Sequence, residues 1–525
     1  MIFRSPFPDV VVPDVSLHEL LFADVAERAD RVALIDGTSG AEMTYGQLAG
    51  AIDRLAAALA ERGIGKGDVV GILSPNTPYY AVVFHGILRA GATATTINAL
   101  YTANEVASQL ADAGAKMLFT VSVLLPNGLP AAQQVGLTDD DVVVLDGAEG
   151  HPSLTTLLAS TGPVPEVVID PAEDVAVLPY SSGTTGKAKG VMLTHRNLVA
   201  NIVQSTPIIN IGGDTRILAV LPFFHIYGMQ VLMNNGLSVG ATVVTMPRFD
   251  LPEFLRVIAE HRTDRVYIAP PVAVALAKHP LVDQFDLSAI DTIFSGAAPL
   301  DVDLAAAVRK RLGCKVLQGY GMTEMSPVSH AIPEGRDDIS VGTVGVIYPN
   351  MENRFVDPAT GEDVGVGERG ELWCRGPNVM KGYLNNEEAT SATLDADGFL
   401  HTGDVAVIDA DGVVSIVDRV KELIKYKGYQ VPPAELEAVL LTHPQIADAA
   451  VVGVLDADGE EVPKAFVVRQ ANADDLDAAG VMTFVADRVA PHKKVRVVEF
   501  IEAIPKSAAG KILRKDLRAR EKADS

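Results

Sequence analysis

The sequence predicts an α/β fold, in which a large N-terminal region precedes a small β-rich part and a small α+β C-terminal domain. Three observations support this prediction. The chain has 525 residues, enough for about three domains of typical size. Short apolar runs alternate with helical patterns in its first half, and closely spaced turns begin near residue 340. Alternating strands and helices are typical of layered α/β proteins, whereas frequent turns are typical of hairpins.

The first half predicts a mostly parallel sheet covered by helices on both faces. Each apolar run of strand length has a neighbour in which apolar residues recur at helical spacing. The predicted strands are residues 32–36, 69–73, 117–121, 266–269 and 315–321. The predicted helices are residues 45–62, a segment ending at Leu88, and residues 105–113, 254–261 and 304–312.

The second half predicts two further units. Asp/Gly turns at residues 357–363, 394–399 and 408–413 indicate a small β-rich subdomain over about 340–418. Past Asp418 the helix and strand pattern returns, so we expect an N-terminal domain over 1–418 and a separate C-terminal domain over 419–525. Its predicted helices are residues 433–442 and 481–489, and its predicted strands are residues 449–455, 464–468 and 495–501.

Composition excludes several classes of protein. Hydrophobic residues are 48% and charged residues 21% of the chain, as in globular proteins and unlike disordered ones. The formal net charge of −24 opposes binding to phosphate backbones, so no nucleic acid partner is expected. Two cysteines, Cys314 and Cys374, do not make a disulfide framework, which favours a reducing cytoplasm.

The sequence contains no membrane or targeting signal that we recognise. The most apolar run, residues 79–88, is well short of the roughly 20 residues that a spanning helix needs. Residues 1–15 include Pro and Asp where a signal peptide would be apolar. The last three residues, Ala-Asp-Ser, match no retention or peroxisomal address. We therefore expect a cytoplasmic protein without integral membrane association.

The strongest chemical signal is LPYSSGTTGKAKGVMLTHRN, residues 178–197. Glycines let backbone N–H groups approach an anion, hydroxyls add donors and lysines add positive charge, so the run predicts a phosphate-binding loop. It is not a Walker A loop, because only two residues separate Gly183 from Gly186-Lys187. The alternative is a polar loop that merely connects two strands.

A second signal is QGYGMTEMSP, residues 318–327. A dinucleotide fingerprint would need Gly at position 324, where Glu stands, so a Rossmann site is excluded. Tyr320 could stack on a base, Thr323 could contact a phosphate and Glu324 could bind Mg²⁺ through oxygen. A tight turn between strand and helix is the alternative interpretation.

Two further segments carry polar residues of interest. HTGD at residues 401–404 and the pair Asp418-Arg419 could bind a ribose or a phosphate, or could be surface turns. PKSAAGKILR, residues 505–514, opens a tail in which residues 506–522 hold many more Lys and Arg than acids. A solvated terminal helix is the usual explanation for such a run.

Taken together, SSGTTGKAKG, QGYGMTE, HTGD, the stretch DRVKELIKYKGYQVPPAELE (418–437) and PKSAAGKILR resemble the adenylate-forming superfamily, in its 4-coumarate–CoA ligase and acyl-CoA synthetase branch. The resemblance covers about residues 15 to 520. It implies a large N-terminal region of two helix-covered sheets and a β-barrel-like part, with a small mobile C-terminal domain. It also implies an enzyme that joins a carboxylic acid to ATP, releases pyrophosphate and passes the acyl group from AMP to coenzyme A.

The resemblance assigns nucleotide-binding roles. Ser181, Ser182, Gly183, Thr184, Thr185 and Lys187 would hold the β- and γ-phosphates, Thr323 would contact the α-phosphate and Glu324 would bind Mg²⁺. Tyr320 would face the adenine, with Gly296, Ala297 and Ala298 on its other side and Asp404 and Arg419 on the ribose. Gln318, Gly319 and Gly321 complete the expected ATP and AMP site.

The resemblance also assigns the catalytic and hinge residues. Lys511 would be the catalytic lysine that reaches the carboxylate and the α-phosphate, whereas Lys506 is too early in the motif. Lys421 would be the hinge about which the small domain turns between two half-reactions. After that turn Lys427 and Gly428 would meet coenzyme A, while Lys425 and Gln430 would support the adenylate.

His225, in LPFFHIYG (221–228), matches the family position beside the acyl carboxylate and the thiol entry, although a histidine in an aromatic run is often only packed. The expected acyl pocket is lined by Tyr227, Val231, Phe294, Gly319, Gly321 and Val328. Such a pocket suits a 4-coumarate-like aryl-propenoate or a medium- to long-chain fatty acid, and sequence does not separate these, because one methylene changes binding by only ~1–3 kcal/mol.

One residue departs from the family pattern. Ala188 stands where the phosphate loop usually has Pro before its second lysine, which predicts a less preorganised loop and a weaker affinity for ATP.

The sequence leaves two alternative functions to compare with this one. One is delivery of the acyl group to a carrier protein, which Lys427-Gly428 disfavours. The other is non-catalytic nucleotide binding, which would predict loss of Lys511, Glu324 or Arg419, and all three are present.

Overall fold

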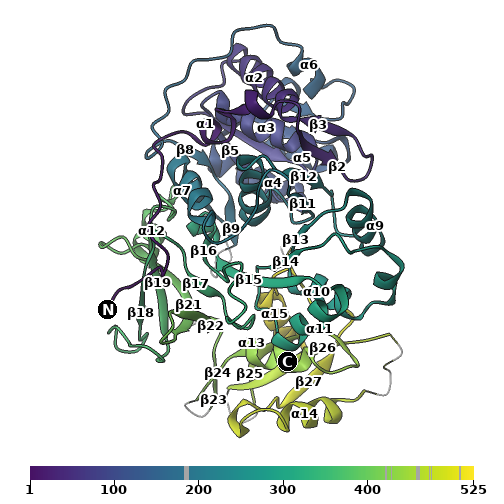
Figure 1. Cartoon of the computed structure of the whole chain (residues 1–525), viewed down its shortest axis with the longest axis vertical. Helices are drawn as coiled ribbons and strands as arrows, with labels where there is room; N and C mark the ends of the chain where they lie inside the picture. Colours follow the sequence, from purple (N-terminus) through teal and green to yellow (C-terminus); the bar gives the residue numbers. More distant parts are fainter. Residues whose placement is uncertain are drawn as a thin grey trace.

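The computed structural model describes residues 1–182, 188–419, 422–426, 429–456, 461–471, 473, 476–507 and 510–524. Figure 1 shows a large N-terminal region, coloured purple to green, and a smaller C-terminal domain in yellow-green that lies below it. This layout confirms the predicted fold class, a large α/β region followed by a small α+β domain.

Parallel strands form one half of a 14-stranded sheet among the described residues. Strands β15, β14, β13, β11, β12 and β2 lie side by side and run parallel, with β3 antiparallel at the edge. This half contains the predicted strands 32–36, 266–269 and 315–321, whereas the predicted strands 69–73 and 117–121 lie in a second sheet and not in the same one. Its strands are β2 (Val32–Asp36), β3 (Glu42–Thr44), β11 (Arg216–Ala219), β12 (Thr242–Thr245), β13 (Arg265–Ile268), β14 (Thr292–Ser295) and β15 (Lys315–Gly321).

The β-rich segment continues the same sheet. From β15 onwards every pairing is antiparallel, in the order β16, β17, β22, β21, β19, β18 and β1. The segment expected as a subdomain of its own is therefore hydrogen-bonded to the parallel half through β15 and β16. Its strands are β1 (Phe3–Arg4), β16 (Val328–Ala331), β17 (Gly345–Ile347), β18 (Glu352–Val356), β19 (Gly370–Arg375), β21 (Leu400–Ile408) and β22 (Val413–Arg419).

A second, 8-stranded sheet belongs to the same region. Strands β8, β5, β4, β6 and β7 are parallel, and β10 adds antiparallel pairings with β8, β9 and β20. Its strands are β4 (Val69–Leu73), β5 (Thr93–Thr96), β6 (Ala115–Thr120), β7 (Val142–Val144), β8 (Val175–Val177), β9 (Tyr180–Ser182), β10 (Ala188–Thr194) and β20 (Gly382–Tyr383).

Helices cover both sheets, and local sequence explains where they begin. Helix α2 starts after Thr44, whose side chain accepts from the backbone of Gln47 in a capping box. Helix α11 starts after Asp301 and ends at Gly313, whose φ of 69° is a left-handed C-cap. The helices of this region are α1 (Leu17–Phe22), α2 (Tyr45–Glu61), α3 (Pro78–Arg89), α4 (Ala103–Ala113), α5 (Leu125–Gln134), α6 (Leu154–Leu158), α7 (His195–Ser205), α8 (Asn235–Ser238), α9 (Leu251–His261), α10 (Pro270–Lys278), α11 (Val302–Leu312) and α12 (Glu387–Thr393).

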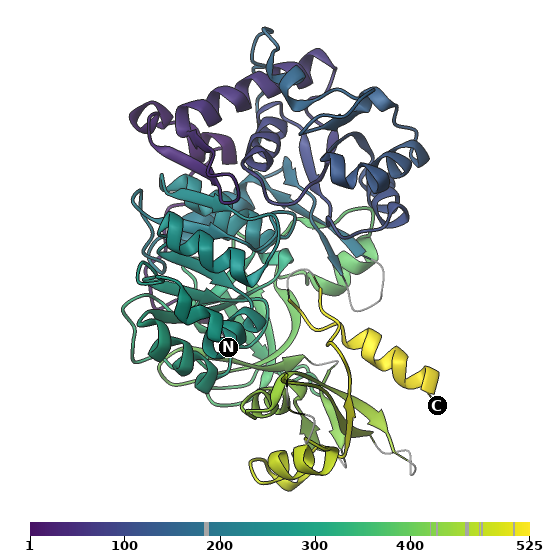
Figure 2. The ribbon, with the colours of Figure 1, turned by 90° about the vertical axis from the view of Figure 1, so that its right-hand side faces the viewer.

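The small domain has its own sheet and core. Strands β25, β26 and β27 form a three-stranded sheet, and β23 pairs with β24. In Figure 2 the chain before the last helix, α15, rises towards the large region before the helix turns away. The elements are β23 (Ile424–Tyr426), β24 (Tyr429–Val431), α13 (Pro433–Leu441), β25 (Ile446–Leu455), β26 (Glu461–Arg469), α14 (Ala478–Ala486), β27 (Val497–Phe500) and α15 (Arg514–Asp524).

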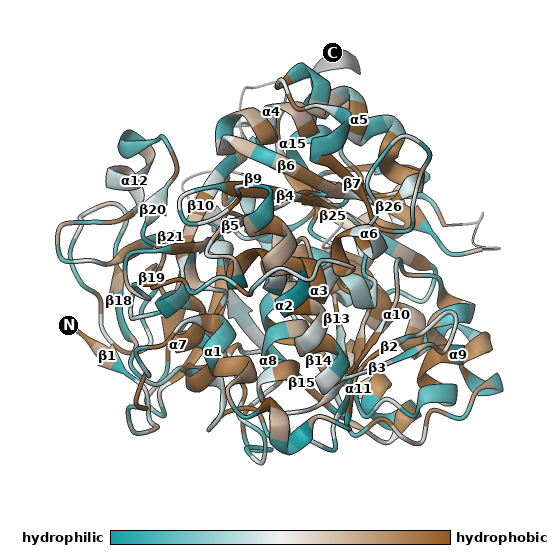
Figure 3. Cartoon of the chain, turned by 90° about the horizontal axis from the view of Figure 1, so that it is seen from above, coloured by the Kyte–Doolittle hydropathy of each residue, from teal (hydrophilic) through white to brown (hydrophobic). Residues whose placement is uncertain are grey.

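Apolar residues concentrate in the strands, as the brown ribbons of Figure 3 show. One main core and a smaller cluster around Leu73 and Leu110 fill the large region, while separate clusters around Ile424 and Phe466 fill the small domain. Burial of this apolar surface is the main stabilising contribution in each part. No helix among the described residues has the length and apolar character that a transmembrane span requires.

Candidate active site

The predicted site residues gather where adjacent parallel strands end. His225 lies beyond the end of β11, Ala269 follows β13, Gly296 follows β14, and Gly319 to Gly321 end β15. These strands are neighbours in the order β15, β14, β13 and β11. Their carboxyl ends therefore meet at one edge of the sheet, the usual position of ligands in α/β proteins. The pairing changes from parallel to antiparallel at β15, which is parallel to β14 and antiparallel to its other neighbour, β16.

Glu324 lies in the short helix η6 (Thr323–Met325) and is 5% exposed. Its Oε1 accepts hydrogen bonds from the Ser181 hydroxyl (3.0 Å) and the Tyr383 hydroxyl (2.9 Å). Its Oε2 accepts none from the described residues. One oxygen of the carboxylate is thus fixed by protein, and the other is available to a cation such as Mg²⁺, which prefers oxygen ligands.

The predicted phosphate loop is described only at its two ends. Ser181 pairs with Lys189 and Ser182 pairs with Ala188 across the β9–β10 hairpin, so the loop between them starts and ends on adjacent strands. The Lys189 ammonium lies 3.9 Å from the centre of the Tyr383 ring, a cation–π contact. The predictions on Gly183, Thr184, Thr185 and Lys187, and on the side chain of Ser182, concern atoms outside the described part of the chain.

Tyr320, Asp404 and Arg419 form a connected group. The Tyr320 hydroxyl donates to Asp404 Oδ2 at 2.5 Å, and Arg419 Nε lies 3.3 Å from Asp404 Oδ1. Asp404 on β21 and Arg419 on β22 face each other in the strand register. Burial, followed by the charge of Asp404, raises the pKa of Tyr320 well above its usual value, which keeps the hydroxyl protonated as a donor. The two residues expected on the ribose are therefore a preformed pair.

The SGAAP loop, residues 295–299, begins at the end of β14. Ala297 has a φ of 70°, a left-handed conformation that costs energy for a residue with a side chain and is concentrated at functional sites. Gln318, expected in the nucleotide site, is instead committed to protein: its amide oxygen accepts from Leu300 N at 3.1 Å and its amide nitrogen donates to Val341 O. Both polar ends of the Gln318 side chain are therefore used to fix the loop.

Glycines allow the walls of the expected acyl pocket to approach closely. A Cβ on Gly319 would lie 2.9 Å from the Phe294 ring, and one on Gly296 would lie 2.7 Å from the Tyr227 ring. Tyr267 packs edge-on against Tyr227 and at a tilt against Phe294. The Phe294 and Tyr227 rings therefore lie against the ends of β15 and β14.

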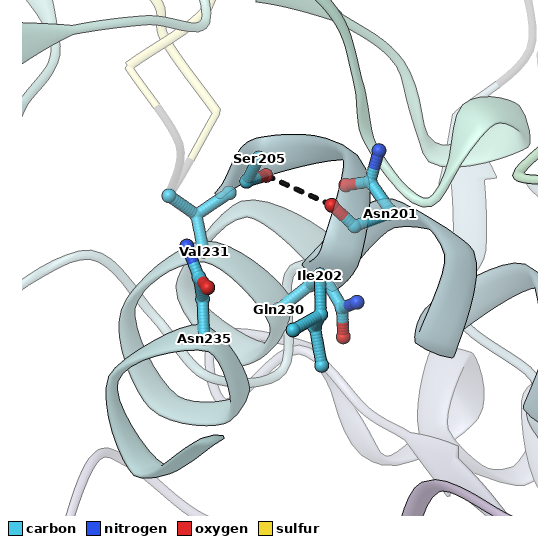
Figure 4. Close-up of a pocket in the computed structure, with 6 residues that line it drawn as sticks. All are labelled: Asn201, Ile202, Ser205, Gln230, Val231 and Asn235. Atoms are coloured by element: carbon cyan, nitrogen blue, oxygen red, sulfur yellow. Dashed lines mark hydrogen bonds between the residues drawn. The ribbon is translucent and has the colours of Figure 1, made fainter. Parts of the chain in front are cut away.

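Val231 and Val328 are linked through helix α7. Val231 belongs to the π-helix η4 (Tyr227–Asn234), a rare form often found at functional sites. In Figure 4 it lines a small pocket with Asn201 and Ser205 of α7, where the Ser205 hydroxyl donates to Asn201 O at 2.8 Å. The amide nitrogen of Asn201 donates to Val328 O at 2.7 Å. Val231 thus borders a polar pocket that the sequence did not indicate, and Asn201 links that pocket to Val328.

His225 is held as a neutral imidazole. Its Nδ1 accepts a hydrogen bond from Tyr227 N at 3.2 Å, which puts the ring proton on Nε2. Burial, with the nearby charge of Lys511, lowers the pKa of His225 to about 4. At neutral pH this residue can donate or relay a proton but carries no charge.

Lys511 comes to the same edge from the small domain. Its backbone is fixed by Ser507: Ser507 N donates to Lys511 O at 2.8 Å, and Lys511 N donates to the Ser507 hydroxyl at 3.2 Å. Gly510 beside it approaches Ala269 at the end of β13, where an added Cβ would be 2.9 Å from the Ala269 Cβ. Burial and Arg419 lower the pKa of Lys511 to about 8, while Asp404 and Glu324 oppose this shift. The ammonium therefore faces both predicted nucleotide-binding carboxylates.

The other predictions have different outcomes. Lys506 forms an ion pair with Asp448 of the small domain at 2.5 Å. Lys421, Lys427 and Gly428, together with the side chains of Lys425 and Gln430, lie outside what the structure describes. Sequence analysis missed Tyr383 and Asn201, because neither belongs to a recognised motif. Only their positions in the fold connect them to Glu324 and Val328.

Comparison with known proteins agrees with this geometry. The AMP-binding enzyme family matches residues 21–384, and the AMP-binding enzyme C-terminal domain matches residues 435–511. 4-Coumarate–CoA ligase 5 of Oryza sativa subsp. japonica is 42% identical, covering 99% of this chain and 97% of the relative. 4-Coumarate–CoA ligase 1 of Petroselinum crispum is 41% identical, covering 99% and 97%.

Solved structures show the same fold. The anthranilate–CoA ligase AuaEII in complex with anthranoyl-AMP superposes with a TM-score of 0.89 at 26% identity, over 97% of this chain and 98% of the other. A benzoate–CoA ligase from Burkholderia xenovorans superposes with a TM-score of 0.86 at 28% identity, over 96% and 100%. The chain therefore belongs to the AMP-binding enzyme family, in its 4-coumarate–CoA ligase branch.

Proposed function

We propose that this chain is an ATP-dependent acid–CoA ligase whose substrate is an aryl-propenoate of the 4-coumarate type. The observation that carries the proposal is the approach of the Lys511 segment, through Gly510, to the end of β13, at the same sheet edge as the Tyr320–Asp404–Arg419 group. The family relationship supports the ligase chemistry, and relatives named 4-coumarate–CoA ligases at 41–42% identity support the substrate class. A medium- to long-chain fatty acid is the alternative substrate.

In the first half-reaction a carboxylate oxygen attacks the α-phosphorus of ATP. The bond from that phosphorus to the bridging oxygen breaks, and pyrophosphate leaves. Both reactants are anionic, so positive charge at the reacting atoms lowers the barrier. We assign this role to the Lys511 ammonium, with Thr323 on the α-phosphate and the 181–187 loop on the outer phosphates. Tyr320, Asp404 and Arg419 hold the nucleoside.

Glu324 would hold Mg²⁺ through its Oε2, the oxygen that no described residue occupies. One carboxylate together with substrate phosphates is a common environment for this ion. When bound, it supplies charge that offsets the repulsion between the phosphates and the incoming carboxylate. Ser181 and Tyr383 orient the carboxylate for that purpose.

In the second half-reaction the sulfur of coenzyme A attacks the acyl carbon, the carbon–oxygen bond to AMP breaks and AMP leaves. We assign His225 Nε2 to the thiol entry, where a neutral imidazole can stabilise the approaching sulfur. A turn of the small domain about a hinge near Lys421 would remove Lys511 from the site. Lys427 and Gly428 would then contact coenzyme A, with Lys425 and Gln430 supporting the adenylate.

The direct test is pyrophosphate release with ATP and Mg²⁺ across 4-coumarate, cinnamate, benzoate and fatty acids of increasing length, with and without coenzyme A. We expect 4-coumarate to be preferred, with a thioester and AMP as products when coenzyme A is present. Preference for a fatty acid would overturn the substrate class. Pyrophosphate release that coenzyme A does not accelerate would indicate a carrier-protein acceptor, and no release with any acid would overturn the ligase function.

The cellular setting is also part of the proposal. Cys314 and Cys374 are free and buried, which suits a reducing compartment, and we propose the cytoplasm. Its partners would be ATP, coenzyme A and a small carboxylic acid. We also propose that the N-terminal domain ends at residue 418, beside the proposed hinge near Lys421.

A further inference from the structure

Helix α13 (Pro433–Leu441) cannot cap its own N-terminus. The sequence before it reads Val431-Pro432-Pro433, and the N-cap residue Pro432 has no side-chain acceptor. Both prolines also lack an N–H, so Ala434 carries the first free backbone donor of the helix. A buried helix start needs a partner for this donor.

That partner is Asp418, on the other side of residues 420–421. Asp418 Oδ2 accepts from Ala434 N at 3.1 Å, and its Oδ1 accepts from Arg419 N at 2.7 Å. Asp418 is 6% exposed and ends strand β22 of the large region's sheet. The large region thus supplies the cap that the helix itself lacks, and the negative charge suits a helix N-terminus.

Lys278 makes the matching contact at the other end. It is the last residue of α10 in the large region, and its Nζ donates to Leu441 O, the last carbonyl of α13, at 3.2 Å. A cation at a helix C-terminus is favourable for the same electrostatic reason. Residues of opposite charge from the large region therefore hold the two ends of one helix of the small domain.

Helix α13 is in turn connected to Lys511. Glu437, in the middle of α13, accepts two hydrogen bonds from Arg514, at 2.6 and 2.7 Å. Both side chains are largely buried, and Glu437 also accepts from Val451 N at 2.8 Å. Arg514 follows Lys511 by three residues, so this contact ties the segment that carries Lys511 to α13.

We propose that Lys278 and Asp418 are positioning residues for the adenylation step: they clamp α13 at both ends and so hold Lys511 over the nucleotide site. This inference rests on the proposed two-step function. The two contacts join parts of the chain on opposite sides of the proposed hinge, so a turn of the small domain breaks the Lys278 contact. The clamp therefore favours the adenylation arrangement over the thioester-forming one.

The test compares the two half-reactions in Lys278→Met. Adenylation is measured as single-turnover pyrophosphate release without coenzyme A, and thioester formation is measured from preformed acyl-AMP and coenzyme A. A partly exposed charge at a helix end shifts an equilibrium by about two- to fivefold. We expect the ratio of adenylation rate to thioester rate to fall by that factor, and to rise again in Lys278→Arg, which keeps the charge and the donor.

The control is Lys310→Met, which removes an exposed lysine from α11, the helix that packs beside α10. It should leave the ratio unchanged. An unchanged ratio in Lys278→Met, or an equal loss in both half-reactions, overturns the clamp. Failure of the proposed function would look different, because the unmodified enzyme would then form no thioester from any acid.

A second measurement reports the arrangement itself. Cys314 and Cys374 are buried, so dyes can be attached selectively at Asp303→Cys on α11 and Thr483→Cys on α14, both exposed positions. Energy transfer between the dyes should shift on Lys278→Met in the direction that coenzyme A with acyl-AMP produces in the parent protein. No shift, or a shift in the opposite direction, contradicts the inference.

Discussion

The two sides of the active site are held in different ways. On the large region, Asp404 is bonded to Tyr320 and paired with Arg419, and Glu324 accepts from Ser181 and Tyr383. On the small domain, the Lys511 ammonium donates no hydrogen bond to the described residues, and only its backbone is fixed. One side is a preorganised platform, while the other is a single charge carried on a loop.

This difference suits chemistry in two steps. Electrostatic stabilisation is most effective when the groups that provide it need no reorganisation, and a platform built on strands of one sheet meets that condition. A catalytic charge that is needed in only one of the steps must be able to leave. A lysine fixed by its own domain, and not by hydrogen bonds to the platform, can withdraw without breaking them.

The largest effect should come from damage to the platform. Asp404→Ala leaves the Tyr320 hydroxyl and the Arg419 guanidinium without their shared acceptor and removes the expected ribose contact. Losses of this kind cost about 3 kcal/mol, or about 100-fold in rate. We expect kcat/KM for ATP to fall by about that factor, measured by pyrophosphate release.

A matched control lies in the same hairpin. Asp411→Ala removes an exposed carboxylate from the turn that joins β21 to β22 and should change kcat/KM for ATP by less than about twofold, as surface substitutions usually do. If Asp404→Ala and Asp411→Ala behaved alike, the Tyr320–Asp404–Arg419 group would have no part in binding ATP.

The pKa of Lys511, on the small domain, predicts a pH effect on adenylation. Lys511 has a pKa of about 8, so raising the pH through 8 removes the proton that offsets the negative charge of the reactants. We expect kcat/KM for the acid, without coenzyme A, to fall about tenfold for each unit above pH 8. In Lys511→Arg the guanidinium stays charged, and the fall should disappear from this range. If kcat/KM of Lys511→Arg still fell above pH 8, the titration would belong to another group.

A smaller effect should come from the support of Glu324. Tyr383→Phe removes one of two donors to Oε1 but leaves the ring that faces Lys189. Loss of one hydrogen bond to a carboxylate is worth about 1.5–3 kcal/mol at most, so we expect an approximately tenfold higher Mg²⁺ requirement in pyrophosphate release. An equal change in Tyr79→Phe, an exposed tyrosine of α3, would show that the effect is not specific to Glu324.

The smallest effect concerns the phosphate loop. Ala188→Pro restores the residue usual in the family and should lower the KM for ATP by about two- to fivefold, because a proline at a compatible position contributes about 0.4–1 kcal/mol of preorganisation. Ala188 lies opposite Ser182 in the strand register. Ala188→Gly, which adds backbone freedom, serves as the opposite control and should raise the KM. An equal or higher KM in Ala188→Pro would remove the explanation.

Sequence patterns predicted the elements in which apolar residues follow one clear pattern. The strands over 32–36, 69–73 and 315–321 occur at those residues, because apolar runs between turns have few other ways to be buried. The π-helix at Tyr227–Asn234 could not be predicted, since its residues are buried all round and show no period. Helix α12 was also not predicted, because it is short and has no buried residues to give it an apolar period.

The same distinction applies to the site. Motifs located Glu324, Asp404, Arg419 and Lys511, because these groups belong to short contiguous signatures. Tyr383 and Asn201 are brought to the site by strand pairing and helix packing over long sequence separations, for which a single sequence holds no signal. Gln318 illustrates the reverse: it lies within a motif, yet its side chain serves the loop instead of a ligand.

The most direct test of the division between the preorganised platform and the Lys511 charge measures the two half-reactions of Lys511→Met separately. Rapid-quench measurement with ATP and 4-coumarate should show adenylation reduced by at least about 100-fold, the size expected for loss of one preorganised charge. The same variant supplied with preformed 4-coumaroyl-AMP and coenzyme A should form thioester at the rate of the parent enzyme. Equal losses in the two measurements would contradict the account, because Lys511 would then belong to the platform.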